Sequence, residues 1–212
     1  IGYNASYTWA NPILKEIEQQ LVIPLFGEFP VEMGINDSNR EAILERFRND
    51  VDYLNRFNAA FPDDQDAVTF PNIIKALAVF NRALISKDSD FDKGTMSSSA
   101  LRGQDLFNSE KMECFHCHNG FNFSDSTLHS DSVFVSRPFF NTGLYNLDDE
   151  GSYPIEDNGL FTVTQNPQDK GKFRPPTLRN VEFTAPYMHD GSIATLAEVL
   201  DFYANGGRNI TS

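Results

Sequence analysis

The only two cysteines of the chain stand three residues apart in MECFHCHNG, residues 112–120, and a histidine follows the second. This order, Cys114-x-x-Cys117-His118, is typical of covalent attachment of c-type haem. Thioether bonds would hold the porphyrin at both sulfur atoms, and His118 would bring an imidazole nitrogen to the iron. We therefore expect one haem c in this chain, bound by these three residues.

A redox-active dithiol and half of a zinc site can show the same cysteine spacing. A thioredoxin-like dithiol lies in a βαβ unit, which the sequence around the motif does not predict. A zinc site needs further Cys or His ligands at regular spacing, and the chain offers no such set. Both alternatives predict a protein without the absorption spectrum of a haem.

Composition and charge limit the classes of partner. Hydrophobic residues make up 40% of the 212 residues, which is enough for a packed core. The net charge of −13 repels nucleic-acid phosphates, so we expect no nucleic acid among the partners. No run of about 18 uncharged apolar residues is present, and we expect no membrane-spanning helix. Because bacteria attach haem c on the outer side of the inner membrane, we expect a periplasmic location.

The hydrophobic pattern predicts a mainly α-helical fold. One helix is expected over residues 38–61, beginning with a capping box of Ser38 and Glu41. A second is expected over residues 71–86, with Pro71 in its first turn. Shorter helices are predicted over 11–25, where Pro24 ends or bends the helix, over 98–118, leading into the haem motif, and over 195–206, with a capping box of Thr195 and Glu198 and with Gly206 as its stop.

Two stretches without helical periodicity divide the chain. Residues 86–99 are polar and serine-rich, and they predict a boundary between two units. We expect a first domain over 1–93 and a second over 94–212. Residues 120–174 are rich in Gly, Asn, Asp, Ser and Pro, which predicts long ordered loops with at most a short hairpin. Loops of that length in a compact domain are usually functional.

The second axial position of the haem iron decides much of its chemistry, because the ligand tunes the reduction potential and an open position admits peroxide. His116 lies inside the motif, too close in sequence to reach the opposite face of the ring. Candidates farther away are Met188, His189 and Tyr203, which lie far enough downstream to return over the ring. The remaining candidates, His129, Met112 and Met96, fit surface or packing roles better.

Two long segments resemble one known family. Residues 172–207, KFRPPTLRNVEFTAPYMHDGSIATLAEVLDFYANGG, follow a C-x-x-C-H motif as in the C-terminal haem domain of the bacterial di-haem cytochrome c peroxidase and MauG family. Residues 6–34, SYTWANPILKEIEQQLVIPLFGEFPVEMG, resemble its N-terminal haem domain after that domain's own C-x-x-C-H, and NAAFP and IIKALAVFNRALIS extend the likeness. The Thr-Trp-Ala-Asn-Pro segment is most similar to the branch that includes the methanobactin-associated enzyme MbnH.

The resemblance implies two cytochrome c-like haem domains, the first of them incomplete in this chain. A second C-x-x-C-H is then expected just upstream of residue 1, and the numbering would cover a segment of a longer polypeptide with two haems. The alternative is a natural single-haem protein. In that case Glu32 and Trp9, described next, would face a haem that is not there.

Individual residues take roles from the same resemblance. Tyr203 matches the sixth ligand of the downstream haem in MauG-like enzymes; the alternative is a core residue, with Met188 as the ligand. Trp9 matches a tryptophan that relays electrons between the haems, although it could also be an ordinary core aromatic residue. Glu32 matches an acid over the open peroxidatic haem, with Glu28 as its competitor, and Gln19 falls near the same pocket. The carbonyls of Thr184 and Pro186 match calcium ligands.

The family implies an oxidoreductase that uses hydrogen peroxide to oxidise a partner protein, such as at a Trp residue, through high-valent haem and electron transfer between the haems. One alternative is an ordinary cytochrome c peroxidase that takes electrons from a small redox protein. Another is a mono-haem electron-transfer cytochrome that does not react with peroxide.

Overall fold

The computed structural model describes residues 2–133 and 137–208, which form two compact units. Unit 1 contains Gly2 and Leu14–Ile85, and unit 2 contains Tyr3–Ile13 and the described part of Ser86–Ser212. The chain thus passes between the units at residues 85 and 86, whereas the sequence analysis placed the domain boundary after residue 93. Tyr3–Ile13 belongs with unit 2 because it pairs with a distant loop: Ala5 N donates to Ser126 O at 3.0 Å.

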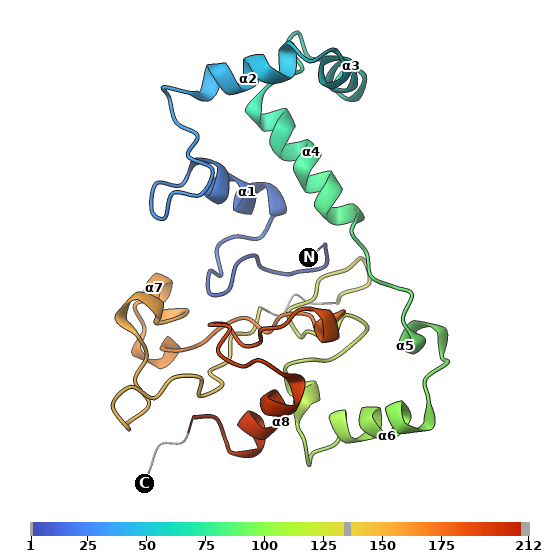
Figure 1. The fold of residues 1–212 in the computed structure, drawn as a ribbon, viewed down its shortest axis with the longest axis vertical. Coiled ribbons are helices and arrows are strands. Elements are labelled where there is room, and N and C mark those ends of the chain that lie inside the picture. The colour runs from blue at the N-terminus through green and yellow to red at the C-terminus, as the bar shows by residue number, and fades with distance from the viewer. Residues whose placement is uncertain (1, 134–136, 209–212) are drawn as a thin grey trace. The chain divides into compact units, whose positions relative to one another are not determined.

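Unit 1 consists of four helices, α1 (Ile17–Phe26), α2 (Arg40–Arg48), α3 (Val51–Ala60) and α4 (Phe70–Ala83). Within the unit, α1 contacts α4 and α2 contacts α3 (Figure 1). The buried cluster that joins these helices is formed by Ile35, Leu44, Phe57, Ala67, Val68, Phe70 and Ile73.

The predicted single helix over 38–61 is wrong, because the chain forms α2 and α3 with a break at Asn49 and Asp50. The side chain of Asp50 accepts hydrogen bonds from Asp52 N and Tyr53 N, and this N-cap starts a new helix. The predicted capping box of Ser38 and Glu41 is also wrong, since it does not form. Asn39 is the N-cap of α2, and the Ser38 hydroxyl instead donates to Asn36 Oδ1 at 2.6 Å.

The other helices of unit 1 follow the sequence more closely. Helix α4 has Pro71 in its first turn, as predicted, and its N-cap is Thr69. Helix α1 begins later than predicted, at Ile17, and continues two residues beyond Pro24. It ends where Gly27 N donates to Ile23 O at 2.7 Å.

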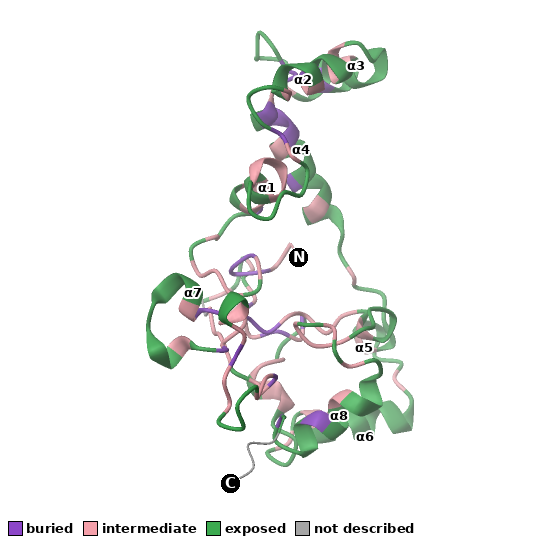
Figure 2. Cartoon of the chain, turned by 60° about the vertical axis from the view of Figure 1, so that its left-hand side comes forward, coloured by how far each residue is buried: buried purple, intermediate pink, exposed green. Residues whose placement is uncertain are grey.

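Unit 2 is built mainly from loops. Its helices are α5 (Asp90–Lys93), α6 (Ser98–Phe107), α7 (Phe161–Thr164) and α8 (Leu196–Ala204), joined by short 3-10 turns. Figure 2 shows that buried residues of this unit lie largely in loops, whereas α6 has no buried residue. The buried apolar side chains of the unit are Ala5, Tyr7, Leu144, Tyr153, Leu160 and Phe202.

Several predictions for unit 2 can be judged directly. The capping box of Thr195 and Glu198 is confirmed, and α8 ends before Gly206, which has a φ of +76°. The helix predicted over 98–118 is too long, since α6 ends at Phe107 and Cys114–His116 forms a 3-10 turn. The described residues of 120–174 contain isolated bridges such as Phe140 with Phe173, but no hairpin. Across the described ranges, the helices are too short and too polar to cross a membrane.

Candidate haem site

His118 is oriented by the loop that follows the cysteine motif. Its Nδ1 lies 3.1 Å from the backbone carbonyl of Phe123, to which only a protonated Nδ1 can donate. This hydrogen bond fixes the tautomer and leaves Nε2 with its lone pair, which is how a metal-binding histidine is usually held. Burial lowers the pKa of His118, which favours the neutral imidazole that coordinates iron.

The two cysteines are free, half-buried thiols. Burial raises the pKa of both thiols, and the negative charge of Asp125 raises that of Cys117 further. A catalytic dithiol needs the opposite environment, one that lowers a thiol pKa and supplies thiolate. The surroundings of Cys114 and Cys117 therefore suit thioether attachment better than thiol–disulfide exchange.

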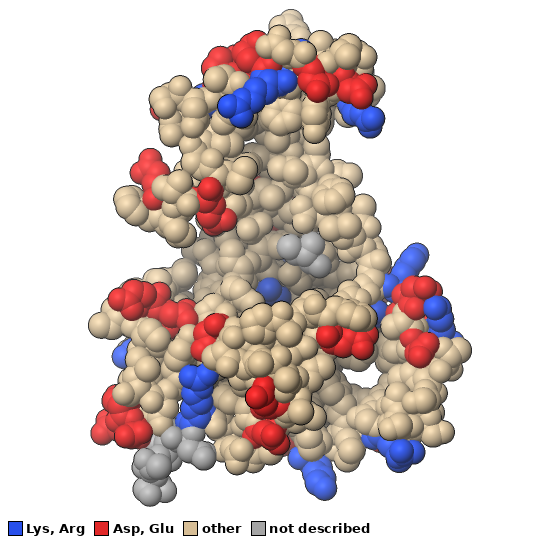
Figure 3. Space-filling model, viewed as in Figure 1, with Lys and Arg blue, Asp and Glu red and all other residues tan. Residues whose placement is uncertain are grey.

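Helices α6 and α8 present apolar side chains that protein atoms leave uncovered. Leu196, Leu200 and Tyr203 share one face of α8 at helical spacing and are 38, 56 and 49% exposed. Leu101 and Leu106 on α6 are 46 and 49% exposed. Both helices lie at the same end of unit 2 in Figures 1 and 2, and Figure 3 shows an opening through the unit beside α6. Apolar faces beside a C-x-x-C-H motif fit a porphyrin.

Tyr203 lies within electrostatic reach of the motif. Partial burial raises the pKa of its phenol, and Cys117 and Cys114 raise it further when their thiols ionise. The fold thus places Tyr203 near Cys114 and Cys117, three residues that the sequence predicted for the haem site. As the sixth ligand, Tyr203 remains a prediction.

The competing ligands have other surroundings. His189 Nε2 lies 2.9 Å from Asp157 Oδ1, and its ring is stacked on Phe173 with centroids 4.1 Å apart. This nitrogen is therefore engaged by a carboxylate. Met188 is half-buried in a turn, where it has a φ of +70°.

Trp9 belongs to unit 2 and is not a core residue. Its side chain is 40% exposed, and its ring meets that of His189 edge-on with centroids 5.1 Å apart. Its carbonyl accepts a hydrogen bond from Arg174 N at 2.8 Å. Trp9 is thus held in place by its backbone and remains accessible at its ring.

The two other predicted catalytic residues belong to unit 1. Gln19 is an exposed residue of α1, and its Oε1 accepts a hydrogen bond from Lys15 N at 3.0 Å. Glu32 is exposed in the loop after α1, and so is its competitor Glu28. Their proposed roles at a peroxidatic haem stay predictions.

The predicted calcium ligands lie at the surface of unit 2. Thr184 and Pro186 are exposed in the segment that follows the 3-10 turn Val181–Phe183. The Thr184 hydroxyl donates to Val181 O at 3.2 Å, which leaves the Thr184 carbonyl as the atom that would meet a cation. Calcium binding stays a prediction.

Two hydrogen-bonded pairs near the predicted site residues could not be predicted from the sequence. Asp157 is 32 residues from His189, and Arg179 is 58 residues from Phe121, whose carbonyl it binds. Both stand in stretches without periodicity, where no local signal indicates a partner. Only the fold of the loops brings these pairs together.

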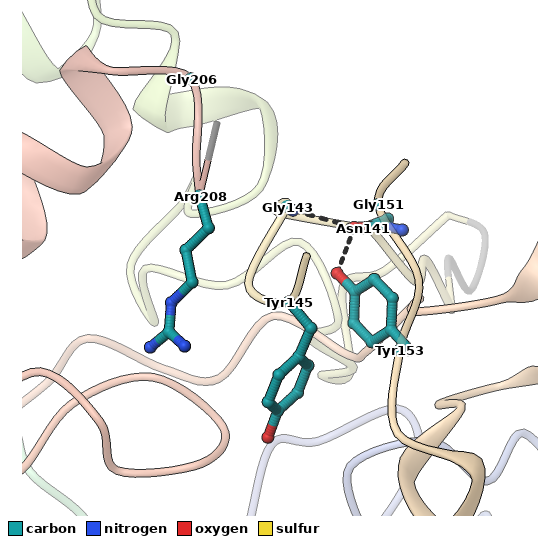
Figure 4. A pocket seen from close by; sticks show the side chains of 7 residues that line it. All are labelled: Asn141, Gly143, Tyr145, Gly151, Tyr153, Gly206 and Arg208. Carbon is teal, nitrogen blue, oxygen red and sulfur yellow. Dashed lines mark hydrogen bonds between the residues drawn. The ribbon is translucent and has the colours of Figure 1, made fainter. Parts of the chain in front are cut away.

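A cavity of about 330 Å3 lies in the loops of unit 2 (Figure 4). Its walls include two tyrosines, Tyr145 and Tyr153, whose rings lie 5.2 Å apart, and the guanidinium of Arg208 faces Tyr145. A smaller cavity of about 170 Å3 is lined by residues just after the haem motif, among them Phe121 and His129.

Comparison with known proteins identifies the family. The family model for di-haem cytochrome c peroxidase matches residues 1–100. Cytochrome-c peroxidase IdrP1 of Pseudomonas sp. strain SCT is 35% identical over 180 residues, covering 76% of this chain and 46% of that protein. The chain belongs to the di-haem cytochrome c peroxidase and MauG family. The methylamine utilization protein MauG of Methylorubrum extorquens is 28% identical, with 98% of this chain and 53% of that protein covered.

A solved structure extends the likeness to the fold. A MauG-like protein associated with microbial copper homeostasis has 46% sequence identity and a TM-score of 0.94, covering 99% of this chain and 61% of that protein. The expected mainly α-helical, cytochrome c-like architecture is thereby confirmed. The chain spans about half the length of the curated relatives it matches.

Proposed function

We propose that this chain is part of a di-haem c-type peroxidase-like oxidoreductase that uses hydrogen peroxide to oxidise a partner protein at an aromatic residue. The observation that carries the proposal is the position of Tyr203, on an exposed apolar face of α8 and within electrostatic reach of both cysteines. The names of the relatives, peroxidases and MauG, support this class of reaction.

The proposed haem in this chain would be held by Cys114 and Cys117, and His118 and Tyr203 would bind its iron. Bound haem supplies an iron centre that gives up electrons to peroxide and recovers them from a donor. His118 is pre-oriented for this role by Phe123. A tyrosinate is a hard, anionic donor that stabilises oxidised iron, which suits storage of oxidising equivalents better than transfer at high potential.

The remaining proposed roles concern the complete protein. A second haem, with Glu32 and Gln19 near it, is where we propose that peroxide reacts, and Glu32 would move the proton needed for O–O cleavage. Trp9 would carry electrons between the two centres. Calcium at the Thr184 and Pro186 carbonyls and a periplasmic location complete the proposal. The MauG-like protein named for copper homeostasis supports the predicted branch.

Two measurements on the complete mature protein test this function. An intact mass spectrum should show two covalent haems; a single haem would favour the electron-transfer cytochrome. Peroxide should then be consumed with oxidation of a protein aromatic residue, detected by peptide mass spectrometry of a co-purified partner. Consumption that depends only on a small reduced redox protein would instead indicate an ordinary cytochrome c peroxidase.

A further inference from the structure

A continuous series of ring contacts runs through unit 2 from Trp9, the only tryptophan of the chain. The Trp9 ring lies 5.1 Å from that of His189, which is stacked 4.1 Å from Phe173. Phe173 lies 6.4 Å from Tyr153, and Tyr153 lies 5.2 Å from Tyr145. The series therefore joins the Trp9 indole to a tyrosine in the wall of the larger cavity (Figure 4).

Tyr145 has a proton acceptor at its hydroxyl. The hydroxyl donates to Asp157 Oδ2 at 3.4 Å, and the carboxylate of Asp190 also interacts with it. Burial and the two negative charges raise the pKa of Tyr145 to about 12, so the phenol is neutral near pH 7. A neutral phenol that loses an electron must also release its proton, and a carboxylate within hydrogen-bond reach can take it.

Tyr153 differs from Tyr145 in this respect. It is buried, its hydroxyl donates to the amide oxygen of Asn141, and it accepts a hydrogen bond from Leu144 N at 3.2 Å. Figure 4 shows the Asn141 contact and the Tyr145 hydroxyl pointing away from it. An amide oxygen is a very weak base, so Tyr153 has no group that can take its proton. Tyr153 thus extends the contact between rings but is a poor site for a radical.

We propose that Tyr145 is a redox-active residue, which sends an electron toward Trp9 along this series of rings and its hydroxyl proton to Asp157. The O–H bond of Tyr145 breaks, an O–H bond forms on the Asp157 carboxylate, and the one-electron-oxidised Trp9 ring is reduced. The product is a neutral tyrosyl radical in the cavity wall. Reduction of one hydrogen peroxide to two waters takes two electrons and two protons, so Tyr145 passes on the second electron after the partner protein of the proposed function has reduced its radical. The inference rests on the proposed function for its oxidant.

The first test uses the complete haem-loaded protein, prepared with ring-deuterated tyrosine. One equivalent of hydrogen peroxide is added, the reaction is freeze-quenched, and electron paramagnetic resonance is recorded. We expect a tyrosyl signal that deuteration narrows and that Tyr145→Phe removes. Tyr187→Phe is the matched control, because its hydroxyl donates to the Val181 carbonyl, and the signal should persist in it and in Tyr153→Phe. An undiminished signal in Tyr145→Phe overturns the proposal.

The proton acceptor is tested separately. Asp157→Asn keeps an oxygen that can accept from His189 but removes the base, so we expect the tyrosyl signal to fall to a small fraction of its wild-type yield. Asp190→Asn leaves the hydrogen bond to Asp157 Oδ2 in place and should therefore retain more of the signal than Asp157→Asn. The reverse result, with loss in Asp190→Asn alone, contradicts the assignment of Asp157.

A second experiment, in which light replaces peroxide as the source of oxidation, tests the role of Tyr145 independently of the proposed function. Ile13 is 65% exposed and four residues from Trp9, so an Ile13→Cys variant of the haem-loaded protein can carry a ruthenium bipyridine label. Flash excitation with hexaammineruthenium(III) as electron acceptor then oxidises nearby rings without peroxide. A Tyr145 signal under light but not with peroxide contradicts the proposed function and supports the role of Tyr145. Haems that react with peroxide, with no Tyr145 signal in either experiment, overturn the inference alone.

Discussion

The carboxylate of Asp92 and the guanidinium of Arg179 form a two-pronged ion pair, with N–O distances of 2.8 and 2.9 Å. The same guanidinium donates to the carbonyl of Phe121, just after the haem motif. The pair therefore fastens α5 to two loops of unit 2. Paired hydrogen bonds of this geometry are the strongest form of contact between Arg and a carboxylate.

This pair predicts a pH-dependent stability. Hydrogen bonds from Arg179 and Ser89 hold the pKa of Asp92 well below its usual range. A carboxyl group with a lowered folded-state pKa stabilises the fold fully above the unfolded pKa, about 3.9, and loses this effect as the pH falls further. We expect Asp92→Asn to lower the urea midpoint at pH 7, and its difference from wild type to shrink below about pH 4. Urea unfolding of the haem-loaded protein measures both midpoints.

Asp105→Asn, an exposed substitution on α6, is the control for this experiment. It should change the urea midpoint little at either pH. A deficit in Asp92→Asn that is the same at pH 7 and at pH 3 would contradict the role of the ionised carboxylate.

Gly171 lies directly against Tyr153 and Asn141, two residues that line the larger cavity. It has a φ of +68°, and a Cβ placed there would lie 2.4 Å from Tyr153 Cζ and 2.6 Å from Asn141 Nδ2. Gly94 has a matching φ of +67° but open space around it. We expect Gly171→Ala to cost about 1–3 kcal/mol more than Gly94→Ala in the free energy of unfolding, because only the former must displace a buried ring. Equal losses of unfolding free energy in the two variants, measured by urea denaturation, would contradict this and would show that the Tyr153 ring moves aside at little cost.

Tyr203→Met should raise the reduction potential of the haem that we propose at Cys114 and Cys117. A thioether favours ferrous iron, whereas a tyrosinate favours ferric iron, so we expect an increase on the order of 100 mV, within the ≈ 0.8 V that axial ligands span. Spectroelectrochemical titration measures it. Met188→Leu is the control for the competing ligand and should leave the potential unchanged. A shift in Met188→Leu, with none in Tyr203→Met, would make Met188 the ligand.

Trp9→Phe should slow oxidation of the partner without changing the number of bound haems. Phenylalanine keeps an aromatic ring next to His189 but is much harder to oxidise than tryptophan. We expect the rate to fall by at least about tenfold, or about 1.4 kcal/mol in activation free energy. Tyr53→Phe, a half-exposed substitution on α3, serves as the control. An unchanged rate in Trp9→Phe would exclude electron transfer through this ring.

Local signals in the sequence predicted the helices well where a cap or a proline marked an end. Thr195 with Glu198, and Pro71 after Thr69, are such cases. The prediction failed at Asn49 and Asp50, because the hydrophobic spacing continues through the break and only the Asp50 cap reveals it. Helix periodicity alone cannot distinguish one long helix from two shorter helices with a break between them.

The candidate site was predictable only in part. The spacing of Cys114, Cys117 and His118 was enough to predict them. Tyr203 was predicted because its helix resembles that of the MauG-like enzymes. The partners of His189, which are the rings of Trp9 and Phe173 and the Asp157 carboxylate, come from loops far apart in sequence. The residues of these loops follow no period, so their pairing depends on tertiary structure that no local pattern encodes.

Addition of one equivalent of hydrogen peroxide to the complete ferric protein, followed by stopped-flow absorbance, tests the central claim most directly. We expect rapid changes in the haem spectrum of the wild-type protein, including bands of the haem proposed at Cys114 and Cys117, and altered bands in Tyr203→Met. A spectrum that stoichiometric peroxide leaves unchanged would contradict the account and would identify an electron-transfer cytochrome.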